Sequence, residues 1–392
     1  MSIVHRFAFP TAIHFGAGAA RNVGPHLVEL GKRRPLVVTD RMLAALPVAR
    51  NFVASLQGAG LAVAVFDGVH GNPMASQANA GGLAFRAHEA DCVVGFGGGA
   101  AVDVAKIVGV LGTLGGDALE YAYDHPAVRA IPDDLPYFVA VPTTAGTGSE
   151  VGRSSVISED DSHVKRIVFS AKILAKAVFA DPELMLDLPA SITAATGMDA
   201  LTHNVESYLS PAYHPLCDGI ALEGVRIAAR ALPKAVANGH DVQARADMLM
   251  ASMMGAIAFQ KDLGAVHSCA HALSTVADLH HGLANGIMID HVMRFNLPAA
   301  ATKMAELARV AGVPGGERGD ETAQAQAFIG WLGALKRSLG IPAKLADYRG
   351  ARPLSRADIP ALVAVAEKDL CHQTNPRPCT GDDFRMLFDA AF

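Results

Sequence analysis

The apolar residues of the chain follow one pattern in its first half and another in its second. In the first half, short apolar runs typical of buried strands alternate with helix-length segments. The alternation predicts an α/β domain with a parallel sheet, helices on both faces and an amphipathic helix from about Ala101. The runs lie at residues 36–40, 61–66, 91–96 and 137–142, with shorter ones at 156–158, 166–169 and 177–180.

After Asp181 and Pro182 the strand pattern ends. Long segments rich in Ala, Leu and Met with helical periodicity follow, which predicts an all-helical domain. We expect its first helix to open at residues 188–191 and prolines to separate the helices: Pro211, Pro233, Pro298 and Pro342. The boundary is expected near residues 182–190, and the predicted domains are residues 1–184 and 185–392.

Composition narrows the classes of function. Only 18% of the 392 residues are charged and the net charge is −5, without a basic block, which argues against a nucleic-acid partner. No apolar run reaches the roughly 18 residues of a membrane span, and the N-terminus lacks the apolar core of a signal peptide. Five scattered cysteines are no disulfide framework, so we expect a reducing cytoplasm. The low charge fits a homodimer or larger homo-oligomer.

Three features at predicted strand ends favour a nucleotide site. A glycine cluster at residues 95–100 follows one strand and opens a helix, where backbone N–H groups and the helix dipole favour phosphate. A loop rich in glycine and hydroxyls follows at residues 142–150, and Asp40 ends an earlier strand where it could bind a ribose. The ordinary alternatives are structural turns and helix caps. Together, the features end strands on the expected ligand-binding edge of a parallel sheet.

Histidines concentrate in the second half, where eight of the 16 lie between residues 203 and 291. Asp199 and His203 are four residues apart, as are His267 and His271, so each pair falls on one face of a helix. The pair at residues 280–281 follows after a short connection. Imidazole and carboxylate without cysteine favour Fe(II), Zn(II), Mn(II) or Co(II) over a structural zinc.

The alternative for any one of these histidines is an ordinary core or surface position. Several on neighbouring apolar helices favour a metal site, because unpaired polar groups there are costly. We expect His291 to pack in the interior, and His214 and His240 to lie in surface loops. His280 is assigned no role.

These motifs resemble the iron-containing (group III) alcohol dehydrogenases, and the resemblance runs through essentially the whole chain. The motifs are residues 14–18, 97–99, 142–150, 181–184, 197–200, 281–285 and 375–378. The resemblance implies a dehydroquinate synthase-like architecture, with a Rossmann-like dinucleotide-binding domain, an all-α domain and an active site in the cleft between them. Residues 199–222, 259–261 and 372–376 look like the 4-hydroxybutyrate dehydrogenase branch.

The resemblance also implies roles for individual residues. The metal ligands would be Asp199, His203, His267 and His281, and His271 would lie near the substrate and the nicotinamide. Asp40 would favour NAD over NADP, because its charge would meet the 2′-phosphate. The other cofactor-contacting positions are Asn72, Gly97, Gly98, Gly99, Asp103, Thr143, Thr144, Thr147, Ser149 and Lys165. Ala100 and Ala101 replace hydroxyl residues common in the family, which leaves one expected phosphate contact open.

The implied reaction is reversible oxidation of a small primary alcohol by NAD(H) at Fe(II), with Zn(II) as the alternative metal. The metal would bind the alcohol oxygen and lower its pKa, and His271 would pass the proton to solvent. The 4-hydroxybutyrate branch would imply an ω-hydroxy acid and its semialdehyde. Candidate cations for the carboxylate are Arg153, Lys261 and Arg377, for which surface or interdomain ion pairs are an equal alternative.

Other functions remain alternatives. A maleylacetate reductase-type enzyme, or another member with a different small carbonyl substrate, is the nearest. An enzyme of the dehydroquinate synthase or glycerol-1-phosphate dehydrogenase type would need phosphate-binding basic residues, which are few at residues 267–281. A non-catalytic metal- or nucleotide-binding protein would not need intact motifs in both halves.

Overall fold

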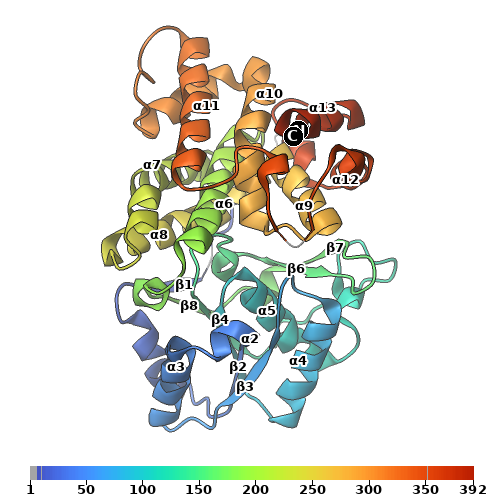
Figure 1. Ribbon diagram of the computed structural model, residues 1–392. Helices are drawn as coiled ribbons and strands as arrows, with labels where there is room; N and C mark the ends of the chain where they lie inside the picture. Colours follow the sequence, from blue (N-terminus) through green and yellow to red (C-terminus); the bar gives the residue numbers. More distant parts are fainter. Residues whose placement is uncertain (1–6, 10, 351) are drawn as a thin grey trace, which may run out of the picture. The chain divides into compact units, whose positions relative to one another are not determined.

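The computed structural model describes residues 7–9, 11–350 and 352–392. The chain divides into two compact units (Figure 1). The α/β unit comprises Ala8–Thr144 and Gly148–Leu186. The helical unit comprises Asp187–Phe392 together with Phe7 and the short segment Ala145–Thr147. The chain therefore enters the helical unit at residue 145, returns to the α/β unit at 148, and leaves it again after 186.

The α/β unit is built on a six-stranded sheet in the order β1-β8-β5-β4-β2-β3, and each neighbouring pair is parallel. β6 and β7 form a separate antiparallel pair. The predicted α/β class is thus confirmed. The strands are β1 (Ala12–Phe15), β2 (Pro35–Asp40), β3 (Ala64–Val69), β4 (Cys92–Gly97), β5 (Tyr137–Pro142), β6 (Ser154–Ser158), β7 (Lys165–Phe169) and β8 (Ala177–Ala180).

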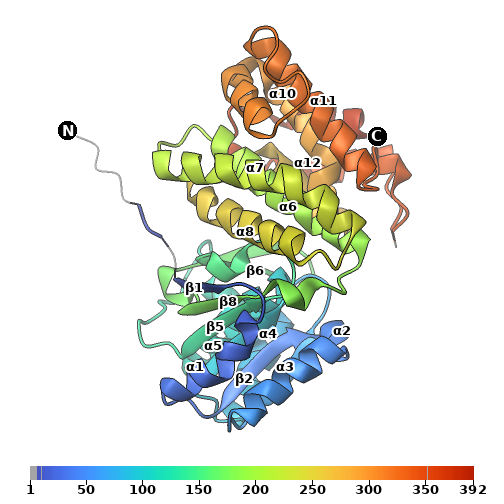
Figure 2. The same cartoon turned by 90° about the vertical axis from the view of Figure 1, so that its left-hand side faces the viewer.

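Helices cover both faces of this sheet. α1 and α3 pack together on one face, and α4 and α5 pack together on the other (Figure 2). The central strand β4 is buried along its whole length, as expected for a strand covered on both sides. The helices are α1 (Val23–Glu29), α2 (Arg41–Ala44), α3 (Pro47–Gly58), α4 (Ala75–Ala87) and α5 (Gly99–Leu114).

Three expectations for this unit are corrected. The strand expected at 61–66 begins only at Ala64, because Leu61 closes the end of α3 by donating its N–H to Leu56 O. The helix expected from Ala101 begins at Gly99, and it is buried on nearly all sides rather than amphipathic. β1 was not predicted: its four residues are exposed at the sheet edge, so they lack the pattern of a buried strand.

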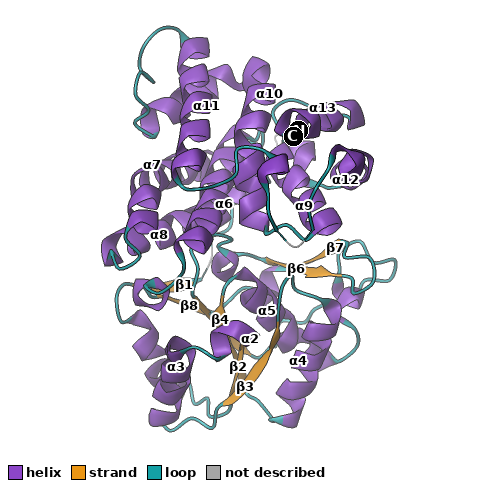
Figure 3. Cartoon of the chain, in the orientation of Figure 1, coloured by secondary structure: helices purple, strands orange, loops and turns teal. Residues whose placement is uncertain are grey.

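The regular elements described for the helical unit are all helices, which confirms the predicted all-α class (Figure 3). Within the described part of the chain, no helix combines the length and the apolar character needed to cross a membrane. The helices are α6 (Ala190–Leu209), α7 (Pro215–Ala237), α8 (Val242–Ala258), α9 (Ala265–Ala277), α10 (His281–Val310), α11 (Glu321–Ser338), α12 (Ile359–Ala366) and α13 (Gly381–Ala391).

The prolines act differently from one another. Pro211 follows the end of α6, and Pro342 follows α11, as expected. Pro233 lies inside α7 and does not end it, because packing against α6 and α8 outweighs the loss of one backbone hydrogen bond. Pro298 lies inside α10, which kinks at Ala300 instead of ending.

Candidate metal centre and nucleotide site

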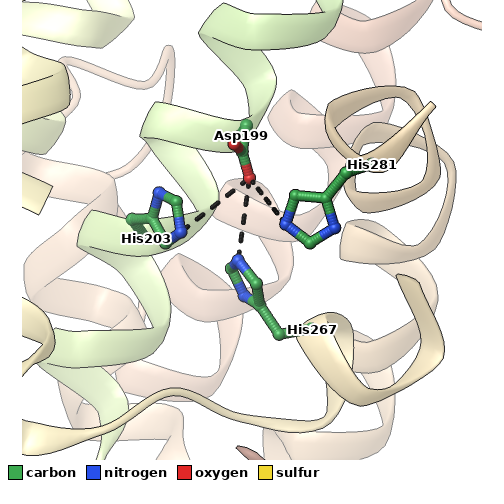
Figure 4. Close-up of side chains that lie close together, drawn as sticks. All are labelled: Asp199, His203, His267 and His281. Atoms are coloured by element: carbon green, nitrogen blue, oxygen red, sulfur yellow. Dashed lines mark ion pairs between the residues drawn. The ribbon is translucent and has the colours of Figure 1, made fainter. Parts of the chain in front are cut away.

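Four side chains from three helices of the helical unit converge on one point (Figure 4). Asp199 and His203 are one turn apart on α6, His267 is on the first turn of α9, and His281 is the first residue of α10. The Asp199 Oδ1 atom lies 3.4 Å from Nε2 of His281, 3.6 Å from Nε2 of His267 and 3.9 Å from Nε2 of His203. One oxygen therefore faces three imidazole nitrogens.

These separations fit a metal ion. Nitrogen and oxygen ligands bind zinc or similar ions at about 2.0–2.1 Å, so two ligand atoms of a tetrahedral site lie about 3.3 Å apart. The four candidate ligand atoms all lie within 4.8 Å of one another. Three imidazoles and one carboxylate form a donor set suited to iron or zinc. The structure thus brings together the four residues singled out as ligands.

Gly282 lets α10 approach α6 closely at this point. A Cβ atom added at Gly282 would lie 2.3 Å from the Ala195 backbone oxygen and 3.2 Å from Asp199 Cβ. No larger residue fits without separating the two helices. This close approach carries the neighbouring His281 to Asp199.

Electrostatics favour the metal-binding forms of Asp199 and His203. Burial alone would raise the pKa of Asp199, but the surrounding histidines hold that pKa well below its usual range. Burial lowers the pKa of His203 to about 4, against the attraction of Asp199. An ionised aspartate and a neutral imidazole are the forms that bind metals.

Glu206, which the sequence analysis did not single out, holds His267 in place. Its Oε2 lies 2.5 Å from Nδ1 of His267, and its Oε1 accepts the Val266 N–H at 2.7 Å. Burial would lower the pKa of His267, but hydrogen bonds with Asp199 and Glu206 raise it to about 9. A carboxylate on the distal nitrogen of a metal-binding histidine fixes the ring and its tautomer. The signal was present, because Glu206 follows His203 by three residues on the same helix face.

Asn285 was also missed as a site residue. Its Nδ2 lies 2.7 Å from Asp199 Oδ1, 3.3 Å from Nε2 of His267 and 3.2 Å from Nε2 of His281. The side chain is fully buried. Its position four residues after His281 on α10 was the available signal. Asn285 thereby orients the Asp199 carboxylate.

His271 lies beside this cluster without contributing to it. Its ring stacks on His281, with ring centroids 5.2 Å apart, and meets the His267 ring edge-on at 6.2 Å. Its Nδ1 lies 2.7 Å from Asp369 Oδ2. No local pattern indicates Asp369, because 98 residues separate it from His271.

The other four histidines between residues 203 and 291 differ in burial. His214 is buried and accepts the Cys217 N–H as the N-cap of α7, so the expected surface position is wrong. Its ring packs against that of Phe7, with the ring centroids 4.2 Å apart, and this contact helps to bury it. His280 is the exposed N-cap of α10, and the His240 side chain is exposed as expected. His291 is partly buried beside Asp290.

In the α/β unit, several predicted cofactor residues lie where strands end. Strand order reverses between β2 and β4, the position at which such sheets bind ligands. Asp40 ends β2 and also caps α2, accepting the Leu43 N–H at 2.8 Å. Gly97 ends β4 with a φ of +153°, and an added Cβ would lie 2.7 Å from Ala101 Cβ and 3.8 Å from Asp40 Oδ2. Asp40 therefore lies beside the glycine turn.

The turn of Gly97, Gly98 and Gly99 also contacts the end of β5. The Thr143 N–H donates to Gly97 O at 3.0 Å, and a Cβ added at Gly98 would lie 3.3 Å from Thr144 Oγ1. Gly98 is the N-cap of α5 and makes no side-chain cap, so the first N–H groups of this helix face the turn.

Other predicted cofactor residues occupy different surroundings. Asn72 lies in the loop after β3, and Lys165 begins β7 outside the main sheet. Thr147 belongs to the helical unit, where an added Cβ on the neighbouring Gly146 would lie 2.8 Å from Thr196 Cβ of α6. The segment Ala145–Thr147 thus packs directly on α6.

Asp103 and Ser149 bond to each other and to a buried lysine. Ser149 Oγ donates to Asp103 Oδ1, and Lys106 Nζ donates to Ser149 Oγ at 2.6 Å and to Asp103 Oδ1 at 3.3 Å. Asp103 Oδ2 accepts the Val156 N–H at 3.0 Å. These contacts connect α5 to β6 and to the segment before it. Contact of Asp103 or Ser149 with a cofactor stays a prediction.

The three candidate cations for a substrate carboxylate already have internal contacts. Lys261 is buried and paired with Asp218. The Arg377 guanidinium lies 3.9 Å from the Phe295 ring centre and donates to Phe295 O. Arg153 lies 5.4 Å from the Phe169 ring centre.

Comparisons with known proteins agree along the whole chain. The family model "Iron-containing alcohol dehydrogenase" matches residues 10–182, and "Fe-containing alcohol dehydrogenase family, C-terminal" matches residues 193–392. The 1,3-propanediol dehydrogenase of Klebsiella pneumoniae is 37% identical over 98% of both chains. The 4-hydroxybutyrate dehydrogenase of Cupriavidus necator is 37% identical over 97% of both. A crystal structure of 1,3-propanediol oxidoreductase superposes with a TM-score of 0.93 at 36% identity, covering 99% of this chain and 100% of that one.

Proposed function

Because the chain belongs to the iron-containing alcohol dehydrogenase family, we propose that it interconverts a small primary alcohol and its aldehyde with NAD(H). The observation that carries this proposal is the convergence of one carboxylate oxygen and three imidazoles at metal-binding separations. We assign metal binding to Asp199, His203, His267 and His281. Fe(II) is the proposed ion, with Zn(II) as the alternative.

A divalent ion at this site supplies a Lewis acid for the substrate oxygen. Glu206 holds His267, and Asn285 orients Asp199. In the oxidation direction, a nicotinamide cofactor held at the turn of Gly97, Gly98 and Gly99 would supply the acceptor for a hydride from the alcohol carbon. The alcohol is thereby oxidised to the aldehyde and NAD⁺ is reduced. We assign His271 to accept the hydroxyl proton and pass it to solvent.

We place the cofactor at the strand ends of the α/β unit, in the predicted domain 1–184, and the metal in the predicted domain 185–392. The glycine turn before α5 and the N–H groups of that helix support binding of the pyrophosphate. The carboxylate of Asp40 supports NAD over NADP, because a 2′-phosphate beside it would be repelled.

The proposed role of Asp40 in choosing NAD over NADP is tested by a variant that loses the negative charge but keeps the cap of α2, compared with a variant that loses both. Asp40→Asn keeps an oxygen that accepts the Leu43 N–H, and Asp40→Leu removes it. We expect Asp40→Asn to lower the NAD-over-NADP preference in kcat/KM at least tenfold with unchanged thermal stability. An unchanged preference in Asp40→Asn would refute the assignment.

The substrate class is a finer proposal. Relatives of equal identity are named for 1,3-propanediol and for 4-hydroxybutyrate, so identity does not choose between a diol and an ω-hydroxy acid. We propose an ω-hydroxy acid as the substrate, because residues 259–261 and 372–376 resemble the 4-hydroxybutyrate dehydrogenase branch. The contacts of Lys261 and Arg377 within their own unit do not add support to this choice.

An NADH-coupled screen tests both the dehydrogenase function and the proposed substrate class. Metal-free protein is loaded anaerobically with Fe(II) or Zn(II) and assayed with a panel of aldehydes that includes succinic semialdehyde and 3-hydroxypropanal. We expect metal-dependent NADH oxidation with a primary aldehyde. Turnover of 3-hydroxypropanal but not succinic semialdehyde would refute the ω-hydroxy acid alone, whereas no turnover with any aldehyde would refute the dehydrogenase function.

We further propose a homodimer or larger homo-oligomer that works in a reducing cytoplasm. The exposed edge strand β1 carries the apolar side chains Ile13 and Phe15, 37% and 41% exposed, and such edges pair readily with another chain. None of the five cysteines is in a disulfide. Light scattering after gel filtration is expected to give a multiple of the chain mass, and Ile13→Lys to reduce it. A monomer at micromolar concentration would contradict this.

A further inference from the structure

Asp369 has no role in the proposals above, yet it lies within hydrogen-bond distance of His271. It lies between α12 and a short 3₁₀ helix, Cys371–Thr374. Its Oδ2 is 2.7 Å from Nδ1 of His271. The two side chains are 18% and 16% exposed, so water screens this pair weakly.

The other oxygen of Asp369 is also fixed. Oδ1 accepts the hydroxyl of Ser268 at 2.7 Å and the N–H of Cys371 at 2.9 Å. The Ser268 hydroxyl in turn accepts the His372 N–H at 2.9 Å. The carboxylate is therefore held by α9 on one side and by the segment after α12 on the other, and it has little freedom to turn.

The charge state of Asp369 determines which nitrogen of His271 carries a proton. Burial would raise the pKa of Asp369, but His271, Ser268 and the Cys371 N–H together hold it well below its usual range. An ionised carboxylate only accepts hydrogen bonds, so Nδ1 of His271 must be the donor. In the neutral ring, Nε2 is then the acceptor.

We propose that Asp369 is a positioning residue that fixes His271 in the Nδ1–H tautomer, so that Nε2 is the atom presented to the reacting alcohol. This inference rests on the proposed function, in which His271 accepts the hydroxyl proton. The orientation matters because the rings of His271 and His281 stack, which places a candidate acceptor against a candidate metal ligand. A ring turned over would present a donor there instead.

An alternative interpretation is that His271, Asp369 and Cys371 form a second metal site. One ligand atom each from His271, Asp369 and Cys371 lie within 4.8 Å of one another. Two observations oppose it. Both Asp369 oxygens are engaged in hydrogen bonds, and burial raises the pKa of the Cys371 thiol well above its usual value, whereas metals bind the thiolate.

The test compares Asp369→Asn with Asp347→Asn, an exposed aspartate of the same unit outside the site. The first readout is nitrogen NMR of ¹⁵N-histidine-labelled, zinc-loaded full-length protein, with the His271 signals assigned from His271→Gln. We expect the Nδ1–H form in the unmodified protein and in Asp347→Asn, and loss of that form in Asp369→Asn. An Nε2–H form in the unmodified protein would overturn the proposal.

The second readout separates positioning from a purely structural role. In Asp369→Asn we expect kcat to fall about 10–100-fold, with KM and metal content within twofold, and Asp369→Glu to recover part of the loss. Equal losses in kcat/KM and metal content would overturn the proposal, as would two metal ions per chain that fall to one in Cys371→Ser.

The test still gives an answer if Asp369→Asn does not fold or if the protein has no dehydrogenase activity. If Asp369→Asn does not fold, Ser268→Ala loosens the same carboxylate from one side, and a smaller fall in kcat with the tautomer retained is expected. If the unmodified protein oxidises no alcohol, the proposed function fails, and the tautomer measured by NMR still decides the role of Asp369.

Discussion

At the scale of single residues, the carboxylate of Glu206 connects a candidate ligand to the start of a helix. It contacts the ring of His267 and accepts the N–H of Val266 in the first turn of α9. A negative charge at a helix N-terminus is favourable. The same charge therefore stabilises α9 and orients the histidine that α9 carries.

We expect Glu206→Gln to weaken metal affinity about 10–100-fold, because an amide holds the imidazole less strongly than a carboxylate does. Competition with a chromogenic chelator measures this. Glu317→Gln, in an exposed loop of the same unit, is the matched control and should bind metal like the unmodified protein. Equal affinity in the two variants would show that Glu206 does not support the site.

A second residue-scale prediction concerns pH. Glu150 is 2% exposed, and burial raises its pKa to about 7, which the nearby Lys106 opposes only in part. A pKa raised on folding means that stability is lost as the pH rises from about 4.5, where the unfolded carboxyl ionises, to about 7. Above pH 7 the loss is complete and constant.

Glu150→Gln removes this loss. We expect the variant to match the unmodified protein near pH 4.5 and to exceed it by about 1–3 kcal/mol at pH 8, measured by urea unfolding. A difference that does not change between the two pH values would contradict the buried, neutral carboxyl.

Local spacing predicted part of the site and could not predict the rest. Asp199 with His203, and His267 with His271, are recognisable because four residues make one helical turn. Asp369 carries no such mark, since only the tertiary fold brings it to His271. His214 misled for the converse reason: a polar residue before a proline is typical of a loop, and burial of a helix cap depends on packing.

At the scale of elements, the approach of α10 to α6 is set by Gly282. We expect Gly282→Ala to reduce metal content and to destabilise the protein by several kcal/mol, because the added carbon would meet the Ala195 oxygen. Metal analysis and thermal unfolding measure the two effects. Gly330→Ala on α11, where nothing lies within 4 Å, is the control and should stabilise by up to about 1 kcal/mol.

Strands whose residues are almost all buried were predicted closely from the sequence. β2, β4 and β5 read as continuous apolar runs, and their bounds agree within one residue with residues 36–40, 91–96 and 137–142. β1 could not be recognised, because an exposed edge strand has no buried face to impose a pattern. Pro233 was expected to separate two helices, but α7 continues through it because tertiary packing outweighs the local preference of proline.

At the scale of the whole molecule, the two proposed ligands belong to different units and should stabilise different parts of the chain. Metal at 100 times its dissociation constant adds about 2.7 kcal/mol to the state that binds it. We expect zinc to slow hydrogen exchange in α6, α9 and the start of α10, and NADH to slow it at the ends of β2 and β4. Mass spectrometry of exchanged peptides measures both. Protection of the end of β2 by zinc alone would contradict the assignment.

The position of Ala145–Thr147 in the helical unit affects both the folding of the protein during synthesis and its division into fragments. The segment leaves the ribosome before α6, on which it packs at Thr196, so this contact cannot form while the rest of the α/β unit is being synthesised. The helical unit cannot complete its packing without this piece of the first half. Cleavage between Leu186 and Asp187 would therefore yield a C-terminal fragment that lacks part of its own interior, and the two halves should be expressed as one chain.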